Sequence, residues 1–568
     1  MTSIRISTGL FLFVACLMMP TAFTTAHEPT VQQSKSAKLG KLGIVNFPTS
    51  AQSDEAQAHF LHGVAALHSF WYPVALDEFR AATKIDPNFM MGYWGEAMTY
   101  NHPLWGDPQE TELARKALAK IRNTPKLAQR EKAYLNAVKV LYDEGEKVTR
   151  DRAYAVAMEK IYQDYPDDRE AALFYALALL GTVHPDDPTA LRTRMQAAAI
   201  ALDIYRKDPD HPGAAHYIIH AFDDPDHAIL ALSVARHYVA IAPPAHHAQH
   251  MPLHVFQQLG MWTDAAAANE AAWKTSDEWV KSNNLSISLR DYHSLHWLLY
   301  SYLQQGRYQE SEDRLLTMQK SLAQFPQDDP RTYAYGMYTH ASMVAEFIVE
   351  TEQWDATERL LPSSPQGKGK DHEPTSGPES HKVFAAIATT PTIFVRGLAA
   401  ALRGSSDAKE SVASLRAIRE QNSDSKEPAL AQVLKMSEIH ELQIAAVSGA
   451  SEGNLEEAIN LIRRATALEE AMGFPTGPLI KPSYELYGEI LLRAGRHTEA
   501  AQQFAKSLMR YPNRAHSLLG AARAAAQSGE TQRAANAYAQ FSRQWQQGDP
   551  QLPALHEAQE YIQQATAR

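Results

Sequence analysis

Apolar and polar positions recur with a helical period along most of this chain. Phe60, Val64 and Leu67 are spaced four and three residues apart, and the segment 75–82 repeats that spacing. Side chains three and four residues apart lie on one face of a helix, so the pattern predicts two amphipathic helices that pack together. Similar segments continue to the end of the sequence, without the strict alternation that is typical of a strand. We therefore expect an all-α fold.

One longer spacing occurs near both ends of the chain. Gly63, Ala75, Phe79, Ala82 and Pro87 are separated by 12, 4, 3 and 5 residues, and Gly488, Ala500, Phe504, Ser507 and Pro512 repeat those intervals. The spacing resembles the signature of the tetratricopeptide (TPR) repeat, in which small residues stand where two helices cross closely. Glycines that resemble the turn between TPR helices recur at Gly260, Gly306, Gly453 and Gly495. The resemblance implies an α-solenoid of TPR-like antiparallel helix pairs and specifies no reaction.

The first 26 residues have the layout of a secretory signal peptide. Arg5 precedes an apolar stretch that is too short to span a membrane, and the small-residue site Thr24-Thr25-Ala26 follows. We therefore expect a periplasmic or secreted protein. An alternative makes Cys16 a lipidated cysteine, but the residues after it stay apolar, and this lipoprotein interpretation is disfavoured.

Composition suggests how the rest of the chain is organised. We expect a signal peptide (1–26), a disordered leader (27–53), a TPR-like array with a histidine-rich middle (54–361), a flexible connector (362–380) and a C-terminal TPR array (381–568). The connector is inferred from its prolines, glycines and charges. The leader is inferred from its polar composition.

Charge, cysteine content and missing motifs argue against several classes of function. The only cysteine lies in the signal segment, so the mature chain offers no thiolate to a metal or to catalysis. The net charge is -11 with no basic run, which argues against a nucleic-acid partner. Serine-hydrolase and phosphate-loop motifs are missing, and Glu485 and Glu489, four residues apart, are interpreted as surface charge.

Histidine departs most from the repeat pattern. Eleven of the 24 histidines fall within residues 211–296, about threefold more than even spreading gives. His216 and His220 are four residues apart, as are His250 and His254, so each pair could present two imidazoles to one ion. With His293 they form the candidate metal ligands, for zinc, copper or iron.

A metal site makes further demands on its surroundings. Asp223, Asp224, Asp291 or a backbone carbonyl should accept the free ring N–H of at least one ligand histidine. The competing interpretation is that these histidines are structural, because such pairs arise by chance in a histidine-rich helical segment. Pro252 supports that alternative, since a proline interrupts a helix and would spoil the shared face of the second pair.

Aromatic residues near the start form a second candidate surface. The candidate ligand-binding residues are Phe70, Trp71, Tyr72, Trp94, His102 and Trp105. They could line a groove for a peptide or a sugar, although aromatic residues at such positions also fill the interior of TPR repeats.

Several segments together resemble a group of exported bacterial TPR-containing proteins of unassigned activity. They are His211-Pro-Gly-Ala-Ala-His216-Tyr-Ile-Ile-His220, Asp223-Asp224-Pro225, His250-Met251-Pro252-Leu-His254 and Tyr93-Trp94-Gly95. The resemblance implies export and no reaction.

The leading hypothesis is an exported scaffold that binds a protein, peptide or small ligand in its concave face, with no membrane span and no assigned catalysis. The alternative is a histidine-rich metal-binding protein or metalloenzyme.

Overall fold

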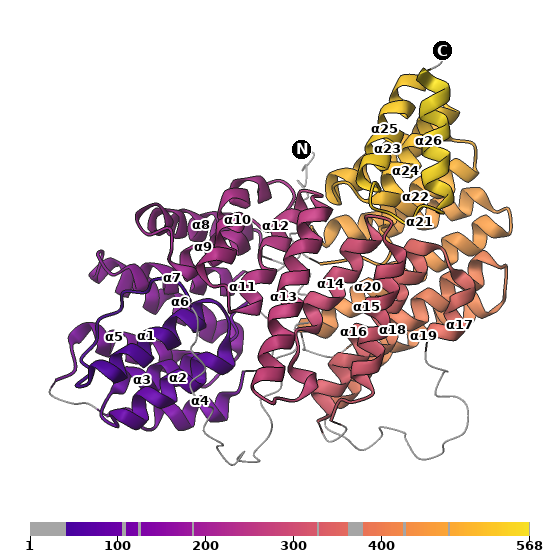
Figure 1. Cartoon of the computed structure of the whole chain (residues 1–568). Coiled ribbons are helices and arrows are strands. Elements are labelled where there is room, and N and C mark those ends of the chain that lie inside the picture. Colours follow the sequence, from indigo (N-terminus) through magenta and orange to yellow (C-terminus); the bar gives the residue numbers. More distant parts are fainter. Residues whose placement is uncertain are drawn as a thin grey trace, which may run out of the picture. The chain divides into compact units, whose positions relative to one another are not determined.

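The computed structural model describes residues 41–104, 109–122, 126–183, 187–326, 329–361, 379–423, 428–474 and 477–566. Within these ranges the secondary structure consists of helices joined by short turns, and they contain no β-strand (Figure 1). The expectation of an all-α solenoid of antiparallel helix pairs is confirmed. The predicted signal peptide and the first part of the predicted leader lie outside the described residues.

The described chain divides into two compact units. An N-terminal unit contains residues 41–255 and 271–279, and a C-terminal unit contains residues 256–270 and 280–566. The segment 362–378, most of the predicted connector, lies outside the described residues, and the helices on either side of it pack against each other within the C-terminal unit. No helix in the described ranges is both long and apolar enough to cross a membrane.

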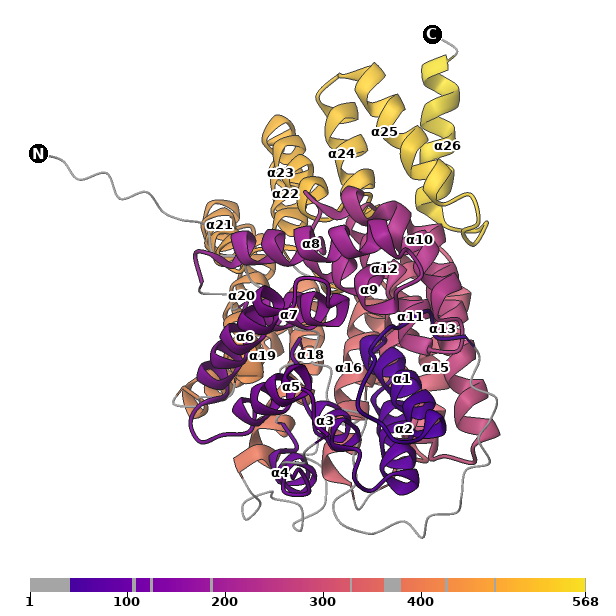
Figure 2. The ribbon, with the colours of Figure 1, turned by 90° about the vertical axis from the view of Figure 1, so that its left-hand side faces the viewer.

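Helices of the N-terminal unit pack mainly on their neighbours in sequence. They are α1 (Asp54–His68), α2 (Tyr72–Ile85), α3 (Met90–Met98), α4 (Thr111–Leu118), α5 (Gln129–Val140), α6 (Lys147–Asp164), α7 (Arg169–Gly181), α8 (Ala190–Lys207), α9 (Pro212–Ala221), η1 (Ala228–Ala231), α10 (Leu232–Ile241), α11 (His246–His250), the start of α12 (Pro252–Gln258) and the middle of α13 (Trp262–Ser282). Helices α1 and α2 lie side by side in both views (Figures 1 and 2). Helix α9 contacts α1 and α7 besides its sequence neighbours α8 and α10, which makes it the central helix of the candidate site.

The first helix pair shows how the repeat residues act. Ser53 caps α1 by accepting a hydrogen bond from the N–H of Ala56, which satisfies one of the free donors of the first turn. Gly63 is buried in the crossing of α1 and α2, where an added Cβ would stand 2.7 Å from the ring of Phe79. The predicted role of Gly63 at a helix crossing is confirmed.

Helices of the C-terminal unit follow the same plan. They are the remainder of α12 and α13, η2 (Ile287–Leu289), α14 (Tyr292–Leu303), α15 (Tyr308–Leu322), α16 (Pro330–Thr351), η3 (Trp354–Ala356), α17 (Thr357–Leu360), α18 (Glu379–Leu402), α19 (Asp407–Gln421), α20 (Pro428–Ser451), α21 (Leu455–Ala471), α22 (Ser483–Arg493), α23 (His497–Arg510), α24 (Ala515–Gln527), α25 (Thr531–Gln544) and α26 (Pro553–Thr566). Gly488 repeats the geometry of Gly63, because a Cβ there would lie 2.7 Å from the ring of Phe504.

Two turn glycines have a second role that the repeat pattern does not predict. Gly260 and Gly306 have φ of +65° and +69°, the left-handed conformation that glycine adopts without strain. The C-terminal repeats pack directly on both turns, so that a Cβ would lie 2.4 Å from the carbonyl oxygen of Pro512 at Gly260 and 2.7 Å from the ring of Trp545 at Gly306. Close packing therefore leaves no room for a side chain at either glycine.

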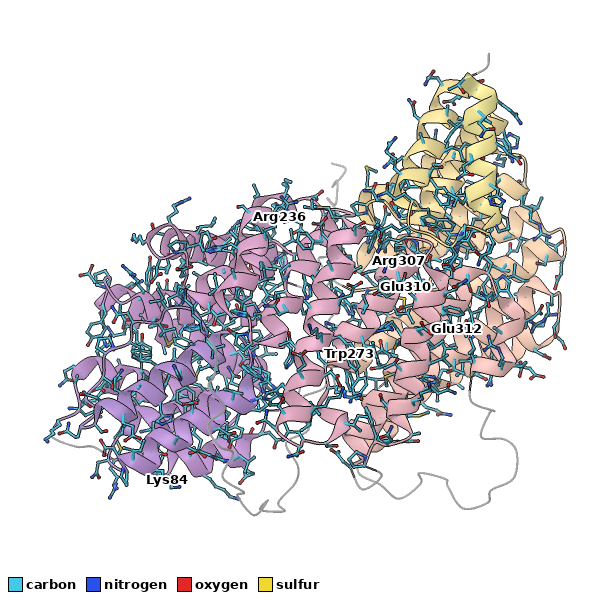
Figure 3. The ribbon with its side chains drawn as sticks, in the orientation of Figure 1. Lys84, Arg236, Trp273, Arg307, Glu310 and Glu312 are labelled. Carbon is cyan, nitrogen blue, oxygen red and sulfur yellow. The ribbon has the colours of Figure 1, made fainter. Side chains whose placement is uncertain are left out.

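The Gly306 turn leads into a charged surface at the start of α15. Arg307 lies 4.0 Å from the ring centroid of Tyr302 and pairs with Glu310, with 2.5 Å between Nε and Oε2 (Figure 3). Because the Glu310 side chain is about half exposed, solvent screens this pair, and its contribution to folding is small.

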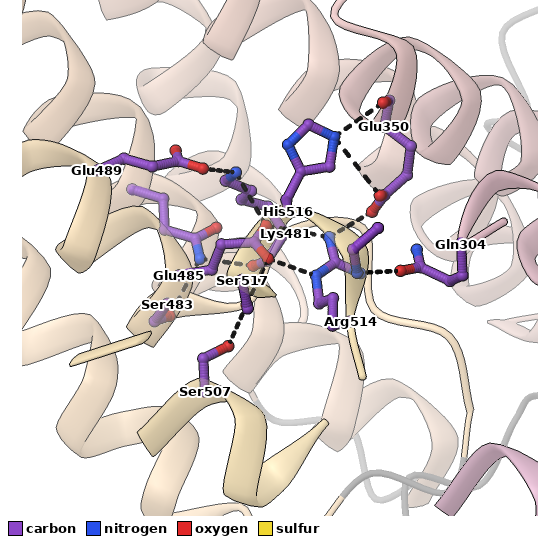
Figure 4. Close-up of polar contacts among 12 residues, drawn as sticks. Gln304, Glu350, Lys481, Ser483, Glu485, Glu489, Ser507, Arg514, His516 and Ser517 are labelled. Carbon is purple, nitrogen blue, oxygen red and sulfur yellow. Dashed lines mark hydrogen bonds and ion pairs between the residues drawn. The ribbon is translucent and has the colours of Figure 1, made fainter. Parts of the chain in front are cut away.

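A buried network of charged side chains links helices that are distant in sequence. Arg514 is fully buried and contacts Glu350 on α16 and Glu485 on α22, while Lys481 bonds both Glu485 and Glu489 (Figure 4). Burial alone would raise the pKa of Glu485, but the two cations more than offset this and hold it well below its usual value. The interpretation of Glu485 as surface charge was wrong, because Arg514, 29 residues further along the chain, packs on it and its side chain is fully buried.

Candidate metal centre

Two of the predicted histidines are on α9, the most enclosed helix of the N-terminal unit. Every residue of α9 is buried, and the helix begins at Pro212, whose missing N–H is not needed in a first turn. His216 and His220 stand one turn apart on it, and their Nε2 atoms lie 3.0 Å from each other. The predicted shared face of this pair is present.

The second predicted pair survives the interruption at Pro252. Helix α11 ends at His250 and α12 begins at Pro252, so the proline does break the helix as expected. The Nε2 atoms of His250 and His254 are nevertheless 3.2 Å apart. The break between α11 and α12 therefore leaves the two imidazoles side by side. The expectation that the proline would spoil this geometry was wrong.

These two pairs belong to one buried histidine cluster. We define the histidine cluster as His216, His220, His247, His250 and His254, all of which are at most 7% exposed. Ring nitrogens of His216, His220 and His247 lie within 4.8 Å of one another. The two pairs are neighbours, with ring centroids 5.9 Å apart for His220 and His254 and 6.0 Å apart for His247 and His250.

Hydrogen bonds to the other ring nitrogens set the tautomers of two cluster members. His216 Nδ1 lies 2.7 Å from the carbonyl oxygen of His68, which can only accept, so His216 Nδ1 carries the proton. His254 Nδ1 lies 2.8 Å from Oδ2 of Asp223, and an ionised carboxylate also only accepts. Both Nε2 atoms therefore present a lone pair to the cluster, as metal ligands do. The expectation that Asp223 or a backbone carbonyl receives a ring N–H is confirmed.

Burial keeps three of these imidazoles, those of His216, His220 and His247, uncharged at neutral pH. Desolvation lowers the pKa of His216 to about 3 and lowers the pKa values of His220 and His247 well below the ordinary histidine value. The other histidines of the cluster act in the same direction, because neighbouring positive charges would repel one another. Neutral imidazole is the form that binds a metal ion.

Phe70 covers one side of the cluster. Its ring centroid lies 4.3 Å from that of His216, 5.8 Å from that of His220 and 5.6 Å from that of His247. Phe70 has φ of +51°, which is uncommon for a residue with a side chain and is found where surrounding structure compensates for the strain. The strained turn after α1 therefore places the Phe70 ring in contact with three candidate ligand histidines.

The other predicted aromatic residues lie in the interior of the N-terminal unit. Tyr72 stacks on Phe70 and contacts His102, with centroid distances of 5.6 and 4.2 Å. Trp71 packs on Trp279, and Trp94 is only 1% exposed. Trp105 lies outside the described residues.

Three further predicted polar positions have contacts within their own units. Asp224 pairs with Arg194 at 2.9 Å and so holds the segment after α9. His293 belongs to the C-terminal unit, where its ring lies 4.9 Å from that of Trp297. Asp291 caps α14 in that unit by accepting a hydrogen bond from Ser294 N.

Sequence reasoning did not select His247 or the buried group beside the cluster. His247 lies three residues before His250, a helical spacing that could have drawn attention to it. His68 and Glu170 have no such signal, because they come from α1 and α7 and meet only in the folded chain. The backbone carbonyl of His68 nevertheless orients His216.

Comparisons with known proteins found similar solved structures, and those reported below are distant matches. No family model and no curated protein matches it. Similar solved structures include the TPR domain of P58(IPK), with 12% identity, coverage of 90% of this chain and 99% of that chain, and a TM-score of 0.20. Others are a human IFIT1 dimer with m7Gppp-AAAA, at 12% identity, 90% coverage of each chain and a TM-score of 0.33, and yeast Tom70, at 11% identity, 90% and 96% coverage and a TM-score of 0.30. Similarities this distant carry no inference about function, so the TPR-like description rests on the helix crossings of this chain itself.

Proposed function

We propose that this protein is an exported helical-repeat metalloprotein that binds a transition-metal ion on His216, His220 and His247, with His250 and His254 beside them. One observation carries the proposal: within each of two neighbouring histidine pairs of the N-terminal unit the two Nε2 atoms lie close together, 3.0 Å apart for His216 and His220 and 3.2 Å apart for His250 and His254. Metal–nitrogen bonds of 2.0 to 2.1 Å place tetrahedral ligand atoms about 3.3 Å apart, close to these separations.

The donor set indicates the class of metal. All five candidate ligands are imidazoles, which suit zinc, copper, iron or nickel and are poor ligands for magnesium or calcium. Lone pairs at His216 and His254 are already directed inward by their partners, so binding would need little rearrangement.

A metal-free explanation of the same geometry exists and can be tested. His220 Nε2–H could donate to His216 Nε2, and His250 Nε2–H to His254 Nε2, as neutral imidazole pairs. In that case a chelator changes nothing. If a metal is bound, removing it lowers the unfolding temperature, because ligand binding to the folded state alone adds to stability.

The decisive experiment is the metal content of the protein without a purification tag. We expect the native protein to contain zinc, copper or iron, with about one ion per chain fewer in His220→Ala and no loss in His237→Ala, a half-buried histidine outside the cluster. Circular dichroism checks that both variants fold. A folded wild-type protein that contains no such metal, takes up none from solution and melts at the same temperature with a chelator would overturn the proposal.

Export and partner binding are separate parts of the proposal. The N-terminal pattern of Arg5, apolar stretch and Ala26 supports export, and a native protein that begins at His27 would support cleavage. The peptide-groove hypothesis has no comparable support, since Phe70, Trp71, Tyr72 and Trp94 are each at most 5% exposed.

A further inference from the structure

A second group of metal-ligating side chains lies in the same unit, outside the histidine cluster. Glu170, the second residue of α7, is completely buried. Its Oε2 lies 2.7 Å from Nε2 of His68 and its Oε1 lies 2.9 Å from Nε2 of His211. One ligand atom from each of the three residues lies within 4.8 Å of the other two. We call these residues the His–Glu–His group.

The charge of Glu170 requires a positive partner. Ionised carboxylates are very rarely buried unless they are paired or bind a metal. Among the described residues, the ion pairs of Glu170 are with His68 and His211, and neither lysine nor arginine takes part. The compensating charge is therefore either a proton on an imidazole or a bound cation.

The surroundings hold His68 in a fixed orientation. Its Nδ1 lies 2.7 Å from the hydroxyl of Tyr217, and its ring stacks on Phe174 with 4.7 Å between centroids. An added Cβ at Gly213 would stand 2.5 Å from His68 Nδ1, so only glycine leaves space for the ring there. A ligand histidine is typically held in this way, with its second nitrogen hydrogen-bonded and its ring packed.

We propose that His68, Glu170 and His211 form a second cation site, which binds one zinc ion or a similar divalent transition-metal ion. Two imidazoles and one carboxylate are a donor set that zinc uses, whereas magnesium and calcium prefer oxygen ligands. The site is distinct from the histidine cluster but adjoins it. His68 directs its ring to Glu170 and its backbone carbonyl to His216, and His211 is the N-cap residue of α9, the helix that carries His216.

The experiment counts ions in matched variants of the full chain. Metal-free protein is loaded with zinc, desalted and measured by elemental analysis. We expect two ions in the wild type and one in Glu170→Gln, which keeps the size of the side chain and removes its charge. His220→Ala should also retain one ion, and the double variant none. Circular dichroism verifies the fold, and His211→Gln replaces Glu170→Gln if that variant does not fold.

The outcomes separate this inference from the proposed function. One ion in the wild type that is lost only in His220→Ala leaves the histidine cluster as a metal site and overturns the second site. One ion in the wild type that is lost only in Glu170→Gln leaves the His–Glu–His group as a metal site and overturns the proposed function of the histidine cluster. X-ray absorption of the zinc-loaded wild type gives an answer without mutation, since an imidazole-only shell with no carboxylate oxygen also overturns the second site.

Discussion

Replacement of Arg514 by methionine tests whether the buried charge network stabilises the C-terminal unit. The Arg514 Nε lies 2.8 Å from Oε2 of Glu485, and another guanidinium nitrogen contacts Glu350 (Figure 4). Its Nη1 lies 2.5 Å from the Tyr300 hydroxyl. Methionine fills a similar volume without the charge. Glu485 then keeps Lys481, at 3.0 Å, whereas Glu350 loses its arginine and keeps the more distant His516, at 3.8 Å.

The expected loss in the free energy of unfolding follows from the loss of the arginine beside Glu350. Breaking a buried ion pair by removing one partner destabilises a protein by about 3 to 5 kcal/mol, because the other charge stays buried without compensation. Arg514→Met combined with Glu350→Gln should be less destabilising than the sum of the single changes, by about 1 kcal/mol or more. The reason is that Glu350→Gln removes the buried charge that Arg514→Met would otherwise leave without its arginine.

Urea unfolding followed by circular dichroism measures these differences. Arg523→Met is the matched control, because Arg523 pairs with Glu557 in the same unit while both side chains are more than a third exposed. We expect the control to lose less than about 1 kcal/mol. If Arg514→Met is no more destabilising than Arg523→Met, or if Arg514→Met and Glu350→Gln are additive, the reasoning about this network is refuted.

Three further predictions test packing and titration in the C-terminal unit. Gly488→Ala should cost about 1 to 3 kcal/mol, because the new methyl group overlaps the ring of Phe504, and an unchanged urea midpoint would contradict the assigned helix crossing. Gly306→Ala should cost at least as much, since it adds left-handed backbone strain to a clash with Trp545; a change below about 0.5 kcal/mol would show that the turn is not closely packed. Burial lowers the pKa of His440 to about 3, so the unfolded state binds more protons below pH 6.5 and stability falls as the pH falls through that window. His440→Leu should therefore reduce the stability lost between pH 6.5 and 5 by about 2 kcal/mol in urea titrations, and an unchanged loss would exclude His440 as a source.

Local pattern was sufficient for the helices and for the residues at their crossings. Gly63 and Gly488 occupy the predicted crossings because the distance from a glycine to the aromatic residue of the next helix is determined by helix length and turn length. The pairs His216 with His220 and His250 with His254 were also readable, since a helical repeat places residues four apart on one face.

Contacts between distant segments determined the rest. Helix periodicity does not reveal that α1 and α7 bring His68 and Glu170 to α9, or that Pro512 and Trp545 cover the turns at Gly260 and Gly306. Nor does it reveal that Glu485 is buried, because its partner Arg514 is 29 residues away. The all-helical repeat and the histidines that share a helix face can be predicted from the sequence, because both depend on neighbours within a few residues. Which histidines come together and which charges are buried can be seen only in the folded chain, because burial and charge pairing depend on all the helices that meet at one point.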